Sequence, residues 1–157
     1  MAGAAQIWGL LTMRLADEDI LPFDHVAQAG ALQKYQKAIE AQGTTLDLST
    51  LNAAIESYAS AAAQIATEIE NGAGGKDVND RLAFTERSFL SEDGLPGRGW
   101  MKHVLQAPGL YLGYAAEALP GVQQALDDDD LEVAQEQAEV AAECIMNSAK
   151  YLGKVMA

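Results

Sequence analysis

The side chains best suited to metal binding or nucleophilic chemistry are His25, His103 and Cys144. A di-iron centre in a helical bundle uses a Glu-x-x-His motif on each of two helices. The residues three positions before the histidines are Pro22 and Trp100, so both copies of that motif are absent. A zinc site would need His and Cys ligands at short spacings, whereas these three residues are scattered along the chain. The sequence therefore predicts no metal site within this chain.

Other catalytic motifs are missing from the sequence as well. There is no GxSxG serine motif and no GxxxxGK[ST] phosphate loop, and the glycines of Gly94–Gly99 are better explained as a turn. Cys144 stands next to Glu143, whose carboxylate would raise the thiol pKa, so we expect a buried small side chain rather than a nucleophile. The acidic run Asp127–Asp130 is interpreted as the N-terminal cap of a helix rather than a cation site. We expect no catalytic residue in this chain.

The composition predicts one folded, acidic domain that spans residues 1–157. Hydrophobic residues make up 49% and charged residues 21%, a balance typical of globular proteins. The formal net charge of −13 would repel phosphate backbones and anionic lipid surfaces, so we expect neither nucleic acid binding nor membrane binding. The apolar stretch Met1–Ala16 is too short to span a bilayer and contains Arg14, so we expect no membrane insertion.

The clearest secondary-structure pattern lies between residues 51 and 69. Apolar residues recur there at alternating spacings of four and three, which is typical of a helix with one buried face. The positions are Leu51, Ile55, Tyr58, Ala62, Ile65 and Ile69. Asp47 or Ser49 is expected to cap the start of this helix, and Asn71-Gly72 its end.

Weaker patterns predict further helices on either side. They are Gln6–Ala16; Asp24 to Gly43 with Val26, Leu32, Tyr35 and Ile39 on its apolar side; Asp77–Leu90 with Val78, Leu82 and Phe89 buried; Tyr114–Leu126, closed or kinked by Pro120-Gly121; and Leu131–Val155. Between residues 91 and 112 the glycines and prolines predict a long irregular segment, and such segments inside a compact domain are usually functional. The predicted fold class is all-α: an up-and-down four-helix bundle with a long irregular insertion before the last helix.

The insertion also holds a cluster of large apolar side chains. Its members are Trp100, Met101, Val104, Leu105, Leu110, Tyr111 and Leu112. The interface candidates among them are Trp100, Met101, Val104, Leu110 and Tyr111. Such a cluster either closes the end of the bundle or forms a contact surface, because tryptophan and tyrosine are enriched at interface hot spots. The residues alone leave both interpretations open.

The order of motifs from residue 20 to residue 126 resembles a known family. The sequence reads Ile-Leu-Pro-Phe-Asp at 20–24, Thr-Glu-Arg-Ser-Phe-Leu at 85–90, Gly-Leu-Pro-Gly-Arg-Gly-Trp at 94–100, Ala-Pro-Gly at 107–109 and Leu-Pro-Gly at 119–121. In this order the motifs resemble the C-terminal helical domain of the transferrin receptor and glutamate carboxypeptidase II family. In that family the domain dimerises, and the peptidase chemistry lies in a different, upstream domain. The resemblance implies a non-catalytic dimerisation module and favours a contact role for the apolar cluster.

The resemblance also assigns a site residue. In the family, a lysine–tyrosine pair from this domain meets the terminal carboxylate of the substrate. The tyrosine matches Tyr114, while Gly113 stands at the lysine position, so a pocket formed with this chain would keep the phenol hydroxyl and lose the ammonium charge. The family's zinc ligands have no counterpart here, which implies that zinc belongs to the peptidase domain of a longer parent chain. The implied partners are a second copy of this chain and that peptidase domain.

Two other functions are left open by the sequence. A catalytic fragment with residual hydrolase activity would require zinc ligands that the sequence does not provide. A helical module that binds a different protein would use its acidic surface to attract a basic partner, and it would stay monomeric at high concentration.

Overall fold

The computed structural model describes residues 2–110 and 115–154. Within these residues the chain is mainly helical, with one short two-stranded sheet, so the all-α class is confirmed. The elements are α1 (Ala2–Asp17), α2 (His25–Glu40), α3 (Ser49–Glu70), α4 (Gly75–Phe84), the 3-10 helix η1 (Thr85–Phe89), β1 (Gln106–Pro108), β2 (Ala116–Ala118), α5 (Pro120–Asp127) and α6 (Leu131–Leu152).

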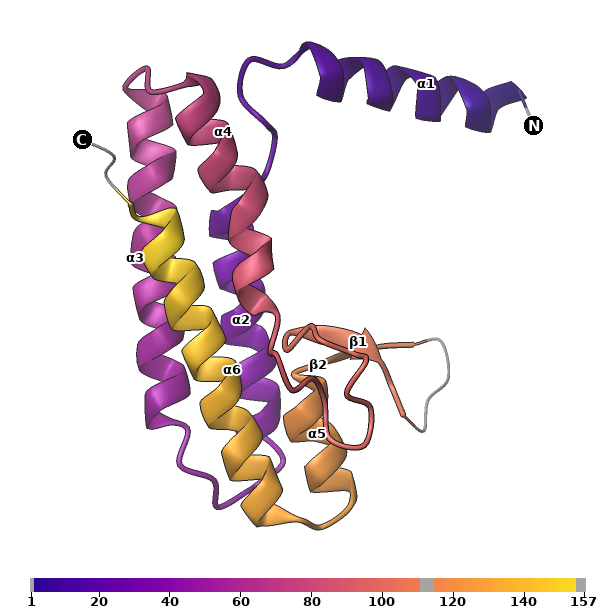
Figure 1. The fold of residues 1–157 in the computed structure, drawn as a ribbon, viewed down its shortest axis with the longest axis vertical. Helices are drawn as coiled ribbons and strands as arrows, with labels where there is room; N and C mark the ends of the chain where they lie inside the picture. The colour runs from indigo at the N-terminus through magenta and orange to yellow at the C-terminus, as the bar shows by residue number, and fades with distance from the viewer. Residues whose placement is uncertain (1, 111–114, 155–157) are drawn as a thin grey trace.

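Four of the helices form the body of the molecule (Figure 1). Helices α2, α3, α4 and α6 run along its long axis, while α5 lies beside α6 and the β1–β2 hairpin contacts α5. The connections from α2 to α3 and from α5 to α6 lie at one end, and the α3–α4 connection lies at the other. Helix α1 projects away from the body at the α3–α4 end.

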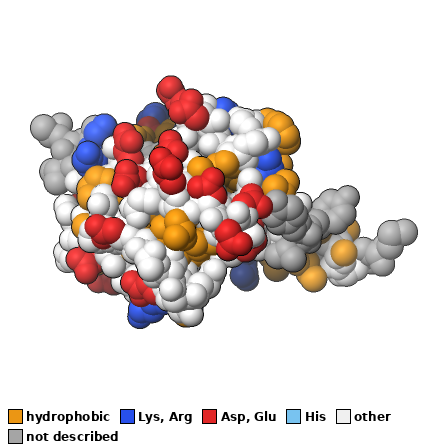
Figure 2. All heavy atoms as spheres, turned by 90° about the horizontal axis from the view of Figure 1, so that it is seen from below, with side chains coloured by type: hydrophobic (Ala, Val, Ile, Leu, Met, Phe, Trp, Pro, Cys, Tyr) orange, Lys and Arg blue, Asp and Glu red, His pale blue; other side chains and the backbone are white. Residues whose placement is uncertain are grey.

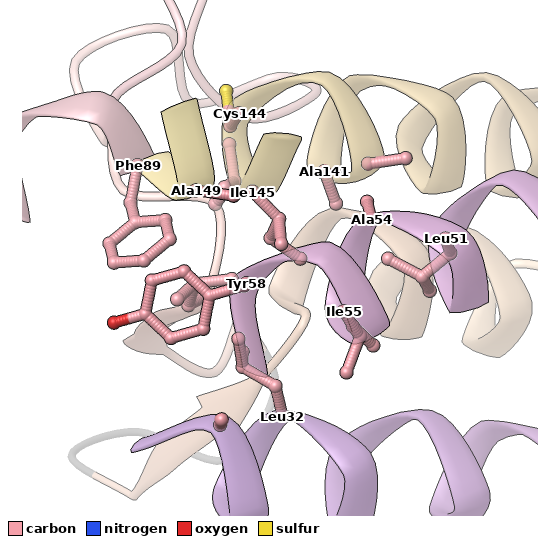
Figure 3. Close-up of a cluster of buried hydrophobic side chains, with 14 of the residues drawn as sticks. Leu32, Leu51, Ala54, Ile55, Tyr58, Phe89, Ala141, Cys144, Ile145 and Ala149 are labelled. Carbon is pink, nitrogen blue, oxygen red and sulfur yellow. The ribbon is translucent and has the colours of Figure 1, made fainter. Parts of the chain in front are cut away.

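The core is centred on the contact between α3 and α6 (Figure 3). Five of the six apolar positions predicted for α3 are buried, and Ile69 is partly buried against the core, so the predicted pattern is confirmed. Opposite α3, helix α6 contributes mostly small side chains, with Ile145 and Leu152 as its largest fully buried members. Tyr58 packs edge-on against Phe89, with 5.7 Å between the ring centroids. The α3–α6 contact thereby extends to η1.

Two of the predicted helix caps are confirmed in detail. The Asp24 carboxylate accepts a hydrogen bond from the backbone N–H of Ala27 at 2.8 Å and caps α2. Asp130, the last residue of the acidic run, accepts from Val133 at 3.1 Å and caps α6. At α3 the N-cap residue is Leu48, and the Asp47 carboxylate instead accepts from the N–H of Ser49 at 2.9 Å. Hydrogen bonding from Ser49, first through its side chain and then through its backbone N–H, holds the pKa of Asp47 below its ordinary value.

Three local predictions were wrong. The helix predicted for Asp77–Leu90 ends as α-helix at Phe84 and continues as the 3-10 helix η1, although Val78, Leu82 and Phe89 are buried as predicted. The segment predicted as a helix over Tyr114–Leu126 contains β2, and α5 begins only at Pro120. Proline fits the first position of a helix because its φ is fixed at a helical value and it has no N–H to leave unpaired. Val26, predicted on the apolar side of α2, is half exposed.

Replacing Ile145 with alanine tests the central role of the α3–α6 contact. Ile145 is fully buried, so Ile145→Ala should lower the free energy of unfolding by about 2–5 kcal/mol through lost burial and the cavity left behind. The control is Glu143→Ala on the exposed side of the same helix, which should change it by less than about 0.5 kcal/mol. Urea denaturation measures both, and equal effects would contradict this description of the core.

Candidate functional site

The insertion leaves the bundle and returns to it at one point. Leu90 and His103 form an isolated antiparallel bridge, and Val104 donates its N–H to the Phe89 carbonyl at 2.9 Å. One residue further out, Ser91 donates to the Lys102 carbonyl at 2.9 Å. The chain between these residues is therefore a closed loop of residues 91–102, with both ends fastened to η1.

A glycine turn shapes the tip of this loop. Gly94 has a φ of +73°, and a Cβ atom placed on it would lie 2.5 Å from the carbonyl oxygen of Gly99. Leu95 is buried, and its backbone N–H donates a hydrogen bond to the carbonyl of Met101 at 2.9 Å. The turn thus folds inward on Leu95, and Trp100 remains outside with 72% of its surface exposed.

The apolar cluster predicted from the sequence is divided between surface and core. Trp100 and Leu110 are exposed, and Met101 is half-buried. Val104 is buried in the core, with only 5% of its surface exposed, so it is not part of an exposed patch. Tyr111 lies outside the described residues. The described members that a partner could reach are Trp100, Met101 and Leu110.

The hairpin that follows the loop flanks the predicted pocket residue. Strands β1 and β2 pair antiparallel, with Gln106 opposite Ala118 and Pro108 opposite Ala116. Gly109 donates its N–H to the Ala115 carbonyl at 3.0 Å and extends this pairing. Tyr114 and Gly113 lie in the connection between the strands, outside the described residues.

A buried arginine ties the loop to the hairpin. Arg98 is 6% exposed, and its Nη1 donates to the carbonyl oxygen of Pro108 at 2.5 Å. Its Nε and Nη2 atoms have no hydrogen-bond partner in the described structure. Glu117 on β2 is also buried. Burial raises the pKa of the Glu117 carboxyl, and Asp127 adds to the rise, while the charge of Arg98 opposes it.

Behind the loop lies a chain of polar contacts that the sequence did not predict. His25 donates from Nε2 to the Leu82 carbonyl at 3.0 Å, because a carbonyl only accepts. Its Nδ1 lies 2.7 Å from the Tyr58 hydroxyl, which is in turn 2.9 Å from Oε1 of Gln28. Gln28 donates through Nε2 to Glu86 at 3.4 Å. These contacts join α2, α3 and the C-terminal part of α4, which contains Leu82, to η1.

The same chain continues to the loop through His103. Its Nδ1 accepts from the N–H groups of Leu105 and Gln106, each at 3.3 Å, so Nε2 carries the proton that is donated to Glu86 at 3.0 Å. The hydrogen bond from His103 is the main reason that the pKa of Glu86 lies below its ordinary value. Burial raises the pKa of Tyr58 far above the usual tyrosine range. The two histidines therefore serve as hydrogen-bonding residues that fasten the insertion to the bundle.

The described residues contain no group of three or more His, Cys, Asp or Glu side chains that could hold a metal ion. Cys144 is a free, buried cysteine on α6. Burial raises the pKa of its thiol, and Glu143 adds to that rise. None of the described helices is long and apolar enough to cross a membrane.

Comparison with known proteins identifies the family of this chain. Residues 32–153 match the transferrin receptor-like dimerisation domain, so the chain belongs to that family. A probable glutamate carboxypeptidase of Arabidopsis thaliana, LAMP1, is 38% identical over 129 residues, which cover 79% of this chain and 19% of that protein. A probable glutamate carboxypeptidase of Arthroderma benhamiae is 33% identical over 159 residues, covering 94% of this chain and 22% of that protein.

The relatives differ in what their names say about activity. A protein of Schizosaccharomyces pombe that is 28% identical over 154 residues, covering 87% of this chain and 19% of that protein, is named an inactive zinc metalloprotease. This chain spans about one fifth of the length of each of these relatives.

Replacing Gly94 tests the turn that shapes the loop. Gly94→Ala should lower the free energy of unfolding by about 1–3 kcal/mol, because alanine is strained at positive φ and its Cβ would meet the Gly99 carbonyl. Gly30, in α2, has open space where a Cβ would lie, so Gly30→Ala should instead raise stability by up to about 1 kcal/mol. Thermal unfolding compares the two, and effects of the same sign would contradict the described turn.

Replacing Glu86 tests the contact with His103 by its dependence on pH. The pKa of Glu86 is lowered from an ordinary value of 4.5. Its contribution to stability is therefore fully present above that value and is lost as the pH falls through the lower pKa of the folded state. Glu86→Gln should lower the free energy of unfolding near neutral pH. The difference in that free energy between the variant and the unmodified chain should shrink below about pH 4.5. Urea denaturation at a series of pH values measures this, and a difference that stays constant in acid would contradict the assignment.

Proposed function

We propose that this chain is a non-catalytic dimerisation module of a glutamate carboxypeptidase-like, zinc metallopeptidase-related protein, and that it works by forming a homodimer. The observation that carries this proposal is the match of residues 32–153 to the transferrin receptor-like dimerisation domain. That range includes most of α2 and all of α3, α4 and α6. The names of the relatives supply the peptidase-like context.

The proposed contact surface is the outer side of the closed loop and the adjoining end of β1. Trp100, Met101 and Leu110 present apolar area there, and Tyr111 is a further proposed member. A two-fold axis repeats every contact, so a modest apolar patch buries twice its own area. Tryptophan is among the residues that most often dominate binding energy. The loop that carries Trp100 is fastened to η1 at both ends, which lowers the entropy cost of association.

A second part of the proposal concerns a longer parent chain. There, Tyr114 would contribute its phenol hydroxyl to one wall of the substrate pocket, next to the parent's peptidase domain. Gly113 offers no ammonium group at the neighbouring position, so the wall would hold a substrate carboxylate less strongly than a lysine–tyrosine pair. Zinc would be held by the peptidase domain, because the residues described here form no ligand cluster.

One observation favours a different partner as a second candidate. Acidic side chains outnumber basic ones on the end of the molecule seen in Figure 2, in keeping with the net charge of −13. An acidic surface speeds association with a basic protein. If that were the main role, the chain would remain monomeric and would bind a basic protein with an affinity that falls as salt is added.

Two tryptophans with similar exposure give a matched test of the proposed dimer. Trp100 is 72% exposed on the loop and Trp8 is 69% exposed on α1. Trp100→Ala should weaken self-association by at least about 2 kcal/mol, or roughly 30-fold in dissociation constant, as for an interface hot spot. Trp8→Ala should leave the dimer dissociation constant unchanged. Sedimentation equilibrium measures both, and a Trp100→Ala protein of unchanged dimer affinity would contradict the proposed surface.

A further inference from the structure

The polar contacts around His25 require more hydrogen atoms than a neutral histidine leaves available. His25 is 5% exposed. Its Nδ1 lies 2.7 Å from the Tyr58 hydroxyl and 3.2 Å from Oε1 of Gln28. The Tyr58 hydroxyl in turn lies 2.9 Å from the same Oε1 atom. These three atoms are therefore all within hydrogen-bond distance of one another.

A neutral His25 leaves one of these contacts without a hydrogen atom. Nε2 donates to the Leu82 carbonyl at 3.0 Å, so Nδ1 of the neutral ring is an acceptor. The amide oxygen of Gln28 is also an acceptor, and the Tyr58 hydroxyl has one hydrogen atom to give to either. Burial, with a smaller effect of the Glu86 charge, raises the pKa of Tyr58 above the usual tyrosine range, so the hydroxyl keeps that atom. One contact, at 2.7 or 2.9 Å, then joins two acceptors.

A second proton on the His25 ring removes this mismatch. Nδ1 then donates to the Tyr58 oxygen, and the Tyr58 hydroxyl donates to Oε1 of Gln28. Gln28 donates through Nε2 to Glu86 at 3.4 Å. Hydrogen bonding from His103 lowers the pKa of Glu86, so these contacts end on an ionised carboxylate. The contacts then run from a cation to an anion, with a donor opposite an acceptor at every step.

The groups packed around His25 include two carboxylates. Glu86 from η1 and Asp24 from the capping turn line the same cavity as His25, which has a volume of about 300 Å³. No lysine or arginine lines that cavity. Helix α3 presents the Tyr58 hydroxyl and α4 presents the Leu82 carbonyl. Burial and the N-terminal end of α2 oppose a positive ring, whereas the carboxylates favour it. The count of hydrogen atoms decides for the positive ring.

Loss of the second proton would reverse the Gln28 amide. With a neutral His25, every contact around Tyr58 has a hydrogen atom only if the amide NH₂ group points at Tyr58, because Tyr58 then donates to Nδ1 and accepts from Gln28. The amide oxygen would then face Glu86, whose carboxylate only accepts. The contact between Gln28 and Glu86 would thereby change from attraction to repulsion. The Gln28 amide has two orientations, and the protonation state of His25 selects between them.

Glu86 transmits this change to the base of the insertion. Its Oε1 accepts from Nε2 of His103 at 3.0 Å, while Nδ1 of His103 accepts from two backbone N–H groups that follow it. His103 forms the bridge with Leu90 at which the closed loop leaves and rejoins the bundle. A carboxylate that is repelled by Gln28 therefore also moves away from the side chain that anchors the loop.

We propose that His25 and Gln28 form a pH-sensitive latch on the closed loop. With two protons on its ring, His25 directs the Gln28 amide towards Glu86, and the loop stays fastened. Loss of one proton reverses the amide and loosens the loop. The contribution of the protonated ring is therefore present at lower pH and is lost as the pH rises. The latch controls the loop that carries Trp100, and it goes beyond the proposed function because it requires neither a second copy nor a parent chain.

Nuclear magnetic resonance of the histidine ring nitrogens tests the charge on His25. Long-range proton–nitrogen spectra of the chain at neutral pH should show a proton on both ring nitrogens of His25. His103 is the internal control and should show a proton on Nε2 alone, because its Nδ1 accepts two N–H groups. A single ring proton on His25 at neutral pH would overturn the proposal.

Replacing Gln28 with glutamate tests the role of the amide. Gln28→Glu places an oxygen against Glu86 in either orientation, so it imitates the reversed amide. The N–H groups of Ser91 and Val104, which close the loop, should lose at least about 10-fold of their protection from hydrogen exchange. Gln33→Glu adds the same charge on the exposed side of α2 and should leave that protection unchanged. Equal effects of the two substitutions would contradict the latch.

A double variant separates the latch from a general loss of stability. Gln28→Glu combined with Glu86→Gln again places a donor opposite an acceptor, so the protection of Ser91 and Val104 should return. A double variant that exchanges as fast as Gln28→Glu alone would rule the latch out. In the unmodified chain the same protection should fall as rising pH removes the second proton from His25, and protection that stays constant through that loss would also overturn the proposal. A monomer that shows the expected results would refute only the proposed dimerisation.

Discussion

The close contact between α3 and α6 is the constraint on which the rest of the structure depends. Both helices present alanines to each other, with Ala54 facing Ala141 in Figure 3, and small side chains let two helix backbones approach closely. Larger side chains, among them those of Ile145 and Tyr58, are buried along the same contact. The many alanines of this sequence thus have a structural use: they create a narrow, well-packed core from two long helices without a large number of aromatic residues.

The core is closed in different ways at one of its ends and at the side of the bundle. At one end Arg81 donates through Nε to the Leu152 carbonyl at 2.9 Å, which caps α6, and through Nη1 to Glu68 at 2.8 Å. At the side of the bundle, η1 packs on α6 and the insertion is fastened to it. The polar chain through Glu86 and His103 then anchors the loop by hydrogen bonds. A rigid bundle therefore holds an exposed loop in a defined place, which is what an interaction module requires.

The parts of the fold that the sequence could predict are those encoded locally. The buried face of α3 follows from apolar spacing within one helix, and the caps at Asp24 and Asp130 follow from side chains that bind amides three residues away. The family could be predicted because turn motifs with proline and glycine occur in a fixed order. These signals need only near neighbours in sequence.

The parts that could not be predicted depend on residues far apart in the chain. His25 and Tyr58 are 33 positions apart and meet only because α2 packs on α3. The segment before α5 pairs as β2 because β1 lies beside it. Pro120, which was predicted to close or kink a helix, is the first residue of α5. Val104 is buried rather than exposed, and its burial likewise depends on the return of the loop to Phe89. For Tyr111 and Tyr114 the sequence-based assignments remain predictions.

The central proposal is that this chain contains a dimerising surface, and the mass of the unmodified chain in solution tests it most directly. Light scattering after size exclusion gives this mass independently of shape, and the monomer is 16.7 kDa. The proposed function predicts a defined species of twice that mass that persists on dilution. A mass of one monomer at every concentration would contradict it, and a mass that grows without limit would point instead to association through the uncovered α1.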